Sequence, residues 1–266
     1  NKTIDEIEMA VENNVGRIVV DHIEEMDLIE AIAREKNKTV NILFRISPGI
    51  NIETHKYIQT GQVDSKFGIP LHKESINQAM EKAINSAHIE LMGFHFHIGS
   101  QLLNPENHLE GIDVLIELMK KVKDQYGFIT KELNTGGGYG IYYTEEEERK
   151  PLKSFIEPIM EEIIRECNKY NLERPLIMIE PGRWIVGEAG ITVYTIGAIK
   201  EIPGVRTYVS IDGGMPDNPR PSLYEAKYNG AILNKINEKA TETVTIAGKC
   251  CESGDILIWN LKTPKI

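Results

Sequence analysis

The stretch Pro175-Leu-Ile-Met-Ile-Glu-Pro-Gly-Arg183 decides the fold. Its first five residues form a short apolar run typical of a strand buried in a parallel sheet. Glu180, Gly182 and Arg183 follow at the carboxyl end of that predicted strand. Ligands of barrels and doubly wound α/β proteins bind at this end. A carboxylate and a guanidinium placed there can hold a ligand that carries both a basic nitrogen and an anionic group.

Four similar apolar runs precede this one and alternate with helical stretches, which predicts a parallel sheet up to about residue 185. The runs span residues 17–20, 40–44, 90–94 and 131–134. Helical spacing is clearest in the apolar residues Ile112, Leu115, Ile116, Met119 and Val122. After Gly190 the pattern changes to β-rich runs at 191–196, 207–211 and 243–247. We therefore expect two domains, residues 1–188 and residues 189–266, of which the second is mostly β.

Composition excludes several classes of function. The chain has 266 residues, of which 41% are hydrophobic and 26% charged, so it can bury a sizeable core. A net charge of -10 and the acidic run Glu145–Glu148 argue against nucleic acid or an anionic membrane as the partner. The three cysteines are too few for a disulfide framework or a zinc site, and no apolar stretch is long enough to cross a bilayer. We expect a cytoplasmic protein without a metal.

Both ends of the sequence look internal to a longer chain. The first residue is Asn1 rather than Met, and Thr3 and Glu6 have the spacing of a helix-capping box. The last residues follow directly after the apolar run Ile256–Trp259. We therefore expect a chain truncated at both ends.

Polar residues also follow the run at 90–94. His95 and His97 lie on the same side of an extended segment, with a Gly-Ser turn just beyond them. They are either satisfied, partly buried side chains or groups that stack on a flat ring. A third ligand for a metal is not evident nearby.

The glycine run Asn134-Thr-Gly-Gly-Gly-Tyr-Gly140 follows the next predicted strand. It is either a flexible turn or a phosphate cradle, because glycine lets backbone amides approach an anion closely. It lacks the Lys-Ser/Thr pair of a nucleotide-binding loop. Since Ser100, the glycines and Arg183 follow successive strands, we expect them to meet at one phosphate.

Two further motifs lie in the β-rich part. Residues 210–224 are rich in turn formers and present Arg220 between two prolines, together with Tyr224. This arginine either grips a substrate carboxylate or is a solvated side chain of a surface loop. Residues 248–255 bring a thiol and a carboxylate together, either for function or in a turn with buried cysteines.

These motifs together resemble those of the diaminopimelate decarboxylases and occur in the same order. They are His95-Phe-His-Ile-Gly-Ser-Gln101, Thr135-Gly-Gly-Gly-Tyr-Gly140, Glu180-Pro-Gly-Arg183, Asp212-Gly-Gly-Met-Pro-Asp-Asn-Pro-Arg-Pro-Ser-Leu-Tyr224 and Cys251-Glu-Ser-Gly-Asp255, with Pro48-Gly49, Thr54-His55 and Asp64-Ser-Lys-Phe-Gly68 as weaker matches. The resemblance covers nearly the whole chain. It implies a fold-type III enzyme that uses pyridoxal 5'-phosphate (PLP). The implied α/β fold is a partial (β/α)8 TIM-type barrel, alanine-racemase-like, followed by a mostly β C-terminal domain.

The resemblance also implies a role for each site residue. PLP would be held by His97, Ser100, Gly136, Gly137, Gly138, Glu180, Gly182 and Arg183, with His97 stacked on the ring and Glu180 paired with the pyridine nitrogen. The substrate would be held by Arg183, Arg220, Tyr224 and Glu252. Cys251 and His97 are the implied catalytic residues, and Cys251 would protonate the substrate carbon that loses CO2. Cys251 and Glu252 match positions that act across a subunit interface, which implies a homodimer with a shared active site.

The implied reaction converts meso-2,6-diaminopimelate to L-lysine and CO2, the last step of lysine biosynthesis. The family's Schiff-base lysine lies in a Tyr-Ala-x-Lys-Ala-like motif that does not occur in this sequence, and Lys66 and Lys249 match other positions. The family's C-terminal tyrosine segment is missing as well. About five of the eight barrel strands are expected, which leaves two sheet edges unpaired. We expect this chain alone to be inactive.

Three alternatives stay open. The first is a decarboxylase of carboxynorspermidine or another basic amino acid within the same family, which the Arg220 and Tyr224 loop disfavours. The second is a PLP-binding homologue without catalysis. The third is an unrelated carbohydrate or nucleotide enzyme with Glu180 as general acid or base, and the lack of a second carboxylate at a strand end weighs against it.

Overall fold

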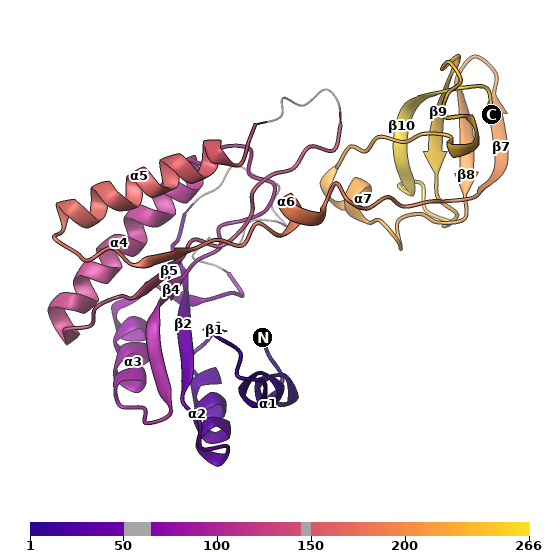
Figure 1. The fold of residues 1–266 in the computed structure, drawn as a ribbon. Coiled ribbons are helices and arrows are strands. Elements are labelled where there is room, and N and C mark those ends of the chain that lie inside the picture. Colours follow the sequence, from indigo (N-terminus) through magenta and orange to yellow (C-terminus); the bar gives the residue numbers. More distant parts are fainter. Residues whose placement is uncertain (51–64, 145–149) are drawn as a thin grey trace. The chain divides into compact units, whose positions relative to one another are not determined.

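The computed structural model describes residues 1–50, 65–144 and 150–266 (Figure 1). These residues form two compact units. The first comprises residues 1–140 and 150–187, and the second comprises residues 141–149 and 188–266. Three predicted features, Thr54-His55, Asp64 and the acidic run Glu145–Glu148, lie outside the described residues.

A parallel sheet forms the centre of the first unit. Its strands are β1 (Ile18–Val20), β2 (Val40–Ser47), β4 (Ile89–His95), β5 (Glu132–Asn134) and β6 (Leu176–Met178), and they lie in the order β1-β2-β4-β5-β6. The two-residue strand β3 (Ile69–Pro70) pairs with β2. Because every pairing is parallel, the carboxyl ends of these strands meet at one edge of the sheet. All five predicted runs of this part therefore form strands.

Helices connect the strands and pack against them to form the core. They are α1 (Ile4–Glu12), α2 (Glu25–Glu35), α3 (Lys73–Ile84), α4 (Glu106–Tyr126) and α5 (Lys153–Lys169), with the short α6 (Gly182–Val186) after β6. The predicted capping box of Thr3 and Glu6 begins α1. The apolar residues of α4 that have helical spacing are all buried. Among the described residues, none of the helices has both the length and the apolar character that a bilayer crossing requires.

The second unit is mostly β. Strands β7 (Ile196–Ile202), β8 (Arg206–Ile211), β9 (Glu242–Ala247) and β10 (Ile256–Thr263) form a sheet in the order β10-β9-β8-β7. The outer pairs are antiparallel and β8 pairs with β9 in parallel. A short helix α7 (Arg220–Tyr224) and a 3-10 helix η2 (Leu233–Lys235) lie between β8 and β9 in the chain. The sheet covers a small core of its own.

The predicted strand at residues 191–196 is wrong. The strand begins only at Ile196, where that run ends, and continues to Ile202. Its position is set by its partner, because β7 pairs with β8 across the turn at Pro203-Gly204. Ile191 and Val193 are 82% and 62% exposed, and no sheet neighbour among the described residues pairs with them. A β-branched run without a neighbouring strand does not form a sheet.

Candidate cofactor site

His95 and His97 lie where β4 ends, on the face away from the helix-packed core. Phe94, Phe96 and Ile98 alternate with them along the chain and are completely buried in that core. Because successive side chains of an extended segment point to opposite sides, both imidazoles lie on the other side of the sheet. That side carries the polar residues of the neighbouring strand ends.

The carboxylate of Glu180 is held by two of these strand ends. His95 Nε2 lies 3.2 Å from Glu180 Oε1, and Asn134 Nδ2 donates a hydrogen bond to the same oxygen at 3.0 Å. The hydrogen bond from His95 is the main reason that the pKa of Glu180 lies below its usual range. Glu180 is therefore anionic at neutral pH, although its side chain is only half exposed.

The three consecutive glycines after β5 pack too closely against neighbouring loops for any side chain. An added Cβ atom would lie 2.2 Å from the carbonyl oxygen of Phe96 at Gly136, 2.4 Å from that of Glu180 at Gly137, and 2.1 Å from that of Gly99 at Gly138. Gly136 and Gly138 also have φ values of 70° and 94°, which favour glycine. The structure thus brings the segment after β4, the glycine run and Glu180 together at one edge of the sheet.

The amides of this glycine run differ in their availability. Gly136 N–H donates to Asn134 Oδ1 at 2.9 Å, and Gly137 N–H donates to His97 Nδ1 at 3.2 Å. Gly138 N–H makes no hydrogen bond within the part of the chain that the structure describes. Of the three consecutive glycines, Gly138 therefore has the amide most available to an anion.

The remaining predicted phosphate ligands lie on the two flanking loops. Ser100 is half-buried and follows Gly99, whose carbonyl oxygen abuts Gly138. Arg183 Nη1 donates to Gln101 Oε1 at 3.3 Å, so the guanidinium lies beside the turn that carries Ser100. Gly182 N–H donates to the carbonyl oxygen of Glu180 at 2.8 Å, so this amide already has an acceptor.

A cavity of about 410 Å³ opens beside Glu180 and His95. Asp21, Arg45 and Phe67 also line it. The guanidinium of Arg45 lies 3.6 Å from Asp21 Oδ1 and 4.4 Å from the centre of the Phe67 ring. Burial lowers the pKa of Arg45, and the carboxylate of Asp21 opposes that effect. The cavity thus places the guanidinium of Arg45 near the anionic Glu180.

Sequence reasoning missed four polar residues of this site. His95 begins one recognised motif and Asn134 directly precedes another, but neither was expected to hold Glu180. Each is the last residue of its strand. Asp21 directly follows β1, and Arg45 lies two residues before the end of β2, without a motif around either. Only their place at the carboxyl ends of predicted strands could have marked them.

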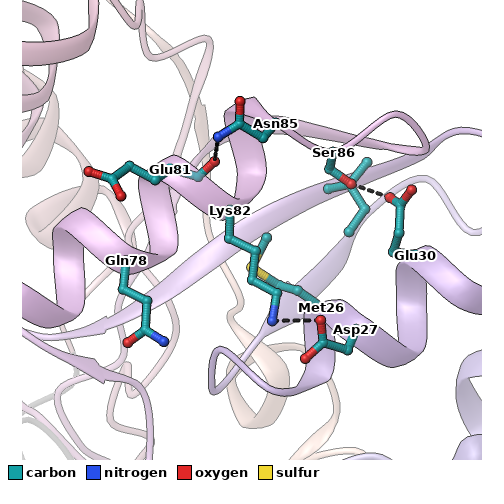
Figure 2. A pocket seen from close by; sticks show the side chains of 9 residues that line it. Met26, Asp27, Glu30, Gln78, Glu81, Lys82, Asn85 and Ser86 are labelled. Carbon is teal, nitrogen blue, oxygen red and sulfur yellow. Dashed lines mark hydrogen bonds and ion pairs between the residues drawn. The ribbon is translucent and has the colours of Figure 1, made fainter.

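A second cavity, of about 460 Å³, lies beside α2 and α3 (Figure 2). Four of its polar side chains already have partners within it, since Lys82 Nζ lies 2.7 Å from Asp27 Oδ1 and Ser86 donates to Glu30. It contains none of the motif residues. The candidate site is therefore the one at the glycine run.

Three carboxylates meet on α4 and α5: Asp113, Glu162 and Glu166, whose oxygens lie within 4.8 Å of one another. Burial, followed by the neighbouring Glu162, raises the pKa of Asp113 to about 6. Lys169 Nζ lies 2.7 Å and Arg165 Nη2 3.3 Å from the Glu166 carboxylate. Since these cations compensate the cluster from within the chain, we assign no metal to it.

In the second unit, Arg220 is held by an aromatic neighbour. Its Nη1 donates to the hydroxyl of Tyr143 at 2.8 Å, and its guanidinium lies 4.7 Å from the centre of that ring. The Tyr143 ring in turn packs edge-on against Tyr228. Arg220 Nε is buried without a hydrogen bond to any described residue. Tyr224, at the other end of α7, is half-buried.

The turn that carries Cys251 and Glu252 is built around a buried carboxylate. Asp255 is 1% exposed and accepts hydrogen bonds from the amides of Met215 at 2.6 Å and Cys250 at 2.8 Å. Ser222 Oγ on α7 donates to the carbonyl oxygen of Gly254 at 2.8 Å, which joins the Arg220 loop to this turn. Cys251 and Glu252 themselves are exposed. The reading of this turn as a site of buried cysteines is therefore wrong for Cys251.

His97 is expected to stay neutral across the physiological pH range. Burial, and secondarily the nearby Arg45, lower the pKa of His97 to about 4. An unfolded histidine titrates near ~6.5, so the unfolded chain binds a proton that the folded chain excludes. The contribution of His97 to the free energy of unfolding is complete above the unfolded pKa of about 6.5. It is lost by up to about 1.4 kcal/mol per pH unit as the pH falls toward the folded value.

An NMR titration of the imidazole resonances checks this expectation. The His97 signal should not move between pH 8 and pH 5.5 in the folded chain. In urea the same signal should titrate near the ordinary histidine pKa. A folded midpoint above pH 6 would contradict the expected environment.

The comparisons with known proteins agree with this geometry. Residues 1–187 match the family model described as "Pyridoxal-dependent decarboxylase, pyridoxal binding domain". Diaminopimelate decarboxylases of Bacillus subtilis and Bacillus methanolicus are 46% and 49% identical over 100% of this chain. The chain spans about 61% of the length of these curated relatives.

Solved structures give the same result. A diaminopimelate decarboxylase from M. jannaschii in co-complex with L-lysine is 32% identical with a TM-score of 0.86, over 100% of this chain and 60% of that one. The Helicobacter pylori enzyme complexed with L-lysine is 32% identical with a TM-score of 0.83, over 100% of this chain and 63% of that one. These matches confirm the predicted partial TIM-type barrel with a mostly β part. This chain belongs to the pyridoxal-dependent decarboxylase family.

Proposed function

We propose that this chain supplies the cofactor site and part of the substrate site of a decarboxylase that converts meso-2,6-diaminopimelate to L-lysine and CO2. The observation that carries the proposal is the Glu180 carboxylate, held anionic by His95 and Asn134 at the carboxyl edge of the sheet. The identities of 46% and 49% to diaminopimelate decarboxylases support the choice of substrate. The L-lysine in two similar structures supports the product.

The residues present fit the two polar ends of PLP. A glycine run with an unused amide at Gly138 suits the phosphate, because a side chain at any of the three glycines would clash with a neighbouring loop. The hydroxyl of Ser100 and the backbone at Arg183 are the further proposed phosphate ligands. The anionic Glu180 suits a protonated pyridine nitrogen at the other end.

The protein groups have distinct tasks around this cofactor. When bound, PLP supplies an electron-withdrawing ring that takes up the electron pair left by the loss of CO2. Glu180 keeps a proton on the ring nitrogen, which maintains the electron demand of the ring. His97 presents a neutral imidazole whose Nδ1 accepts from Gly137 N–H, so its orientation for stacking is fixed.

The second unit carries the groups proposed for the substrate. Arg220, steadied by the Tyr143 hydroxyl, and Tyr224 are the groups proposed for the distal carboxylate. Arg183, which belongs to the first unit, is a further proposed substrate ligand. Glu252 pairs with the distal ammonium group. Cys251 donates the proton from its Sγ to the carbon that has lost CO2. A substrate with a carboxylate and an ammonium at its far end needs both kinds of group.

We also infer a cytoplasmic homodimer with a shared active site and two functional domains, residues 1–188 and 189–266. Cys251 and Glu252 are exposed, as residues that act on a substrate bound by the partner subunit must be. All three cysteines are free, which agrees with a reducing compartment.

An activity assay tests the proposal. A protein that contains this chain together with the family's lysine motif, supplied with PLP and meso-2,6-diaminopimelate, should release L-lysine and CO2 in equal amounts. The 266-residue chain alone should give no product and no borohydride-reducible lysine adduct with PLP, because it lacks the family's lysine motif. A reduced adduct on Lys66 or Lys249 would contradict this expectation. Faster turnover of carboxynorspermidine would favour the alternative substrate, and PLP binding without any turnover would favour a non-catalytic homologue.

A further inference from the structure

We propose that His108 is a positioning residue for the phosphate-binding backbone, because it holds the Gly137-Gly138 peptide from the side opposite the candidate site. This inference rests on the proposed PLP function and adds to it a residue of α4 that belongs to none of the recognised motifs. His108 is 0% exposed.

The contact of His108 with the glycine run requires a side chain that donates a hydrogen bond. His108 Nε2 lies 3.0 Å from the carbonyl oxygen of Gly137. A carbonyl oxygen only accepts, so Nε2 carries the hydrogen, and in the neutral ring Nδ1 carries none. Nδ1 is buried and makes no hydrogen bond within the described ranges. A phenylalanine would fill the same space and would not bury the unpaired Nδ1, but it could not donate a hydrogen bond to Gly137. The hydrogen bond is therefore the contribution that distinguishes histidine from an apolar ring at this position.

The ring of His108 is fixed in place by stacking. It lies parallel to the Tyr139 ring, with ring centres 5.0 Å apart and an interplanar angle of 9°. Tyr139 packs edge-on against Phe155 at 5.6 Å. Burial lowers the pKa of His108, so the ring is neutral and keeps a single N–H. The Nε2–H group of His108 is therefore fixed in both position and direction.

The geometry of the peptide transmits this contact to the site. The Gly137 carbonyl and the Gly138 N–H belong to the same peptide, which is trans like the other peptides of the described residues. In a trans peptide these two groups point in opposite directions. With its carbonyl directed at His108, the peptide directs Gly138 N–H away from α4. Among the three consecutive glycines, this amide is the one that makes no hydrogen bond to a described residue.

A fixed peptide matters here because its neighbours are glycines. A peptide between two glycines can rotate at little steric cost, and a rotated peptide would present a carbonyl oxygen to the phosphate. His97 fixes the preceding peptide through Gly137 N–H, and His108 fixes the following one through Gly137 C=O. The two imidazoles therefore clamp two successive peptides of the run.

Three variants test this role, each made in a protein that contains this chain together with the family's lysine motif. His108→Phe keeps the flat ring and removes the donor, His108→Gln restores a donor, and Tyr139→Phe is the matched control that keeps the ring stack and the Gly137 contact. Affinities of the apoproteins for PLP and for pyridoxal, which lacks the phosphate, are measured by absorbance titration. His108→Phe should bind PLP about 10-fold more weakly and pyridoxal within about 2-fold of wild type. His108→Gln should recover most of the PLP affinity, and Tyr139→Phe should lose none.

The outcomes separate this inference from the proposed function. If His108→Phe loses affinity equally for PLP and pyridoxal, or for neither, the positioning role is overturned while the proposal that the protein binds PLP stands. A wild-type protein that binds pyridoxal as tightly as PLP would overturn the proposed phosphate site itself, and this inference with it. If His108→Phe does not fold, the test is an NMR titration of the wild-type protein with inorganic phosphate. The amide resonance of Gly138 should shift more than those of Gly136 and Gly137, and the reverse order would overturn the proposal.

Discussion

Replacing Glu180 with glutamine should lower kcat for decarboxylation by about 10²–10³-fold while PLP remains bound. The glutamine oxygen can still accept from Asn134 Nδ2, which now bonds to Glu180 Oε1 at 3.0 Å, so the loop should keep its position. What is lost is the negative charge that His95 and Asn134 stabilise. A neutral amide cannot keep a proton on the pyridine nitrogen, so the ring withdraws electrons less strongly.

Release of CO2 under saturating substrate gives kcat, and the absorbance of the bound cofactor shows that PLP is retained. Glu90→Gln is the matched control, because Glu90 is an exposed carboxylate on β4 that pairs with Lys131 at 2.6 Å. The control should retain full activity. A Glu180→Gln protein with kcat within about 3-fold of wild type would exclude the proposed role, since charge stabilisation at a reacting centre has a larger effect.

Gly136→Ala should reduce the free energy of unfolding by about 2–5 kcal/mol, the combined cost of a left-handed backbone and an overpacked contact. Gly136 has a φ of 70°, and an added Cβ would lie 2.2 Å from the carbonyl oxygen of Phe96. That oxygen is backbone and cannot move aside as the end of a flexible side chain would. The variant should also lose most of its PLP affinity, because any shift separates the glycine run from the segment after β4.

Gly127→Ala is the control for the cost of a left-handed backbone without an overpacked contact. Gly127 ends α4 with a φ of 67°, and no atom lies within 4 Å of its added Cβ. Gly127→Ala should reduce the free energy of unfolding by about 1–2 kcal/mol, and its affinity for PLP should not change. Urea denaturation of both variants measures the two costs. Equal losses of stability would show that the contact with Phe96 relaxes freely, and the close approach of the loops would then not constrain the site.

The parallel sheet could be predicted from the sequence because its strands are buried and read as short apolar runs. The run at 40–44 predicted β2, which continues to Ser47 beyond the run. The run at 191–196 did not predict a strand correctly, although it is richer in β-branched residues. Its first residues have no strand beside them in the described part of the chain, and sheet pairing is not encoded in one segment.

Part of the site could be predicted because its residues stand in local motifs. Glycines in sequence and a carboxylate after a strand are visible without a structure. The contacts among them are not, because their partners are far apart in the chain: Asn134 is 46 residues from Glu180, and His108 is 29 residues from Gly137. Which side chains meet at the carboxyl edge depends on the packing of whole strands and helices.

The two oxygens of Glu180 have different tasks. Both His95 and Asn134 contact Oε1, and within the described ranges Oε2 makes no hydrogen bond. One oxygen therefore anchors the carboxylate, and the other is left as an acceptor already aimed before any ligand arrives. Such preorganisation means that a partner with an N–H group meets a fixed charge and pays little for reorienting it. The direction in which that second oxygen points thus sets where the ring nitrogen must lie.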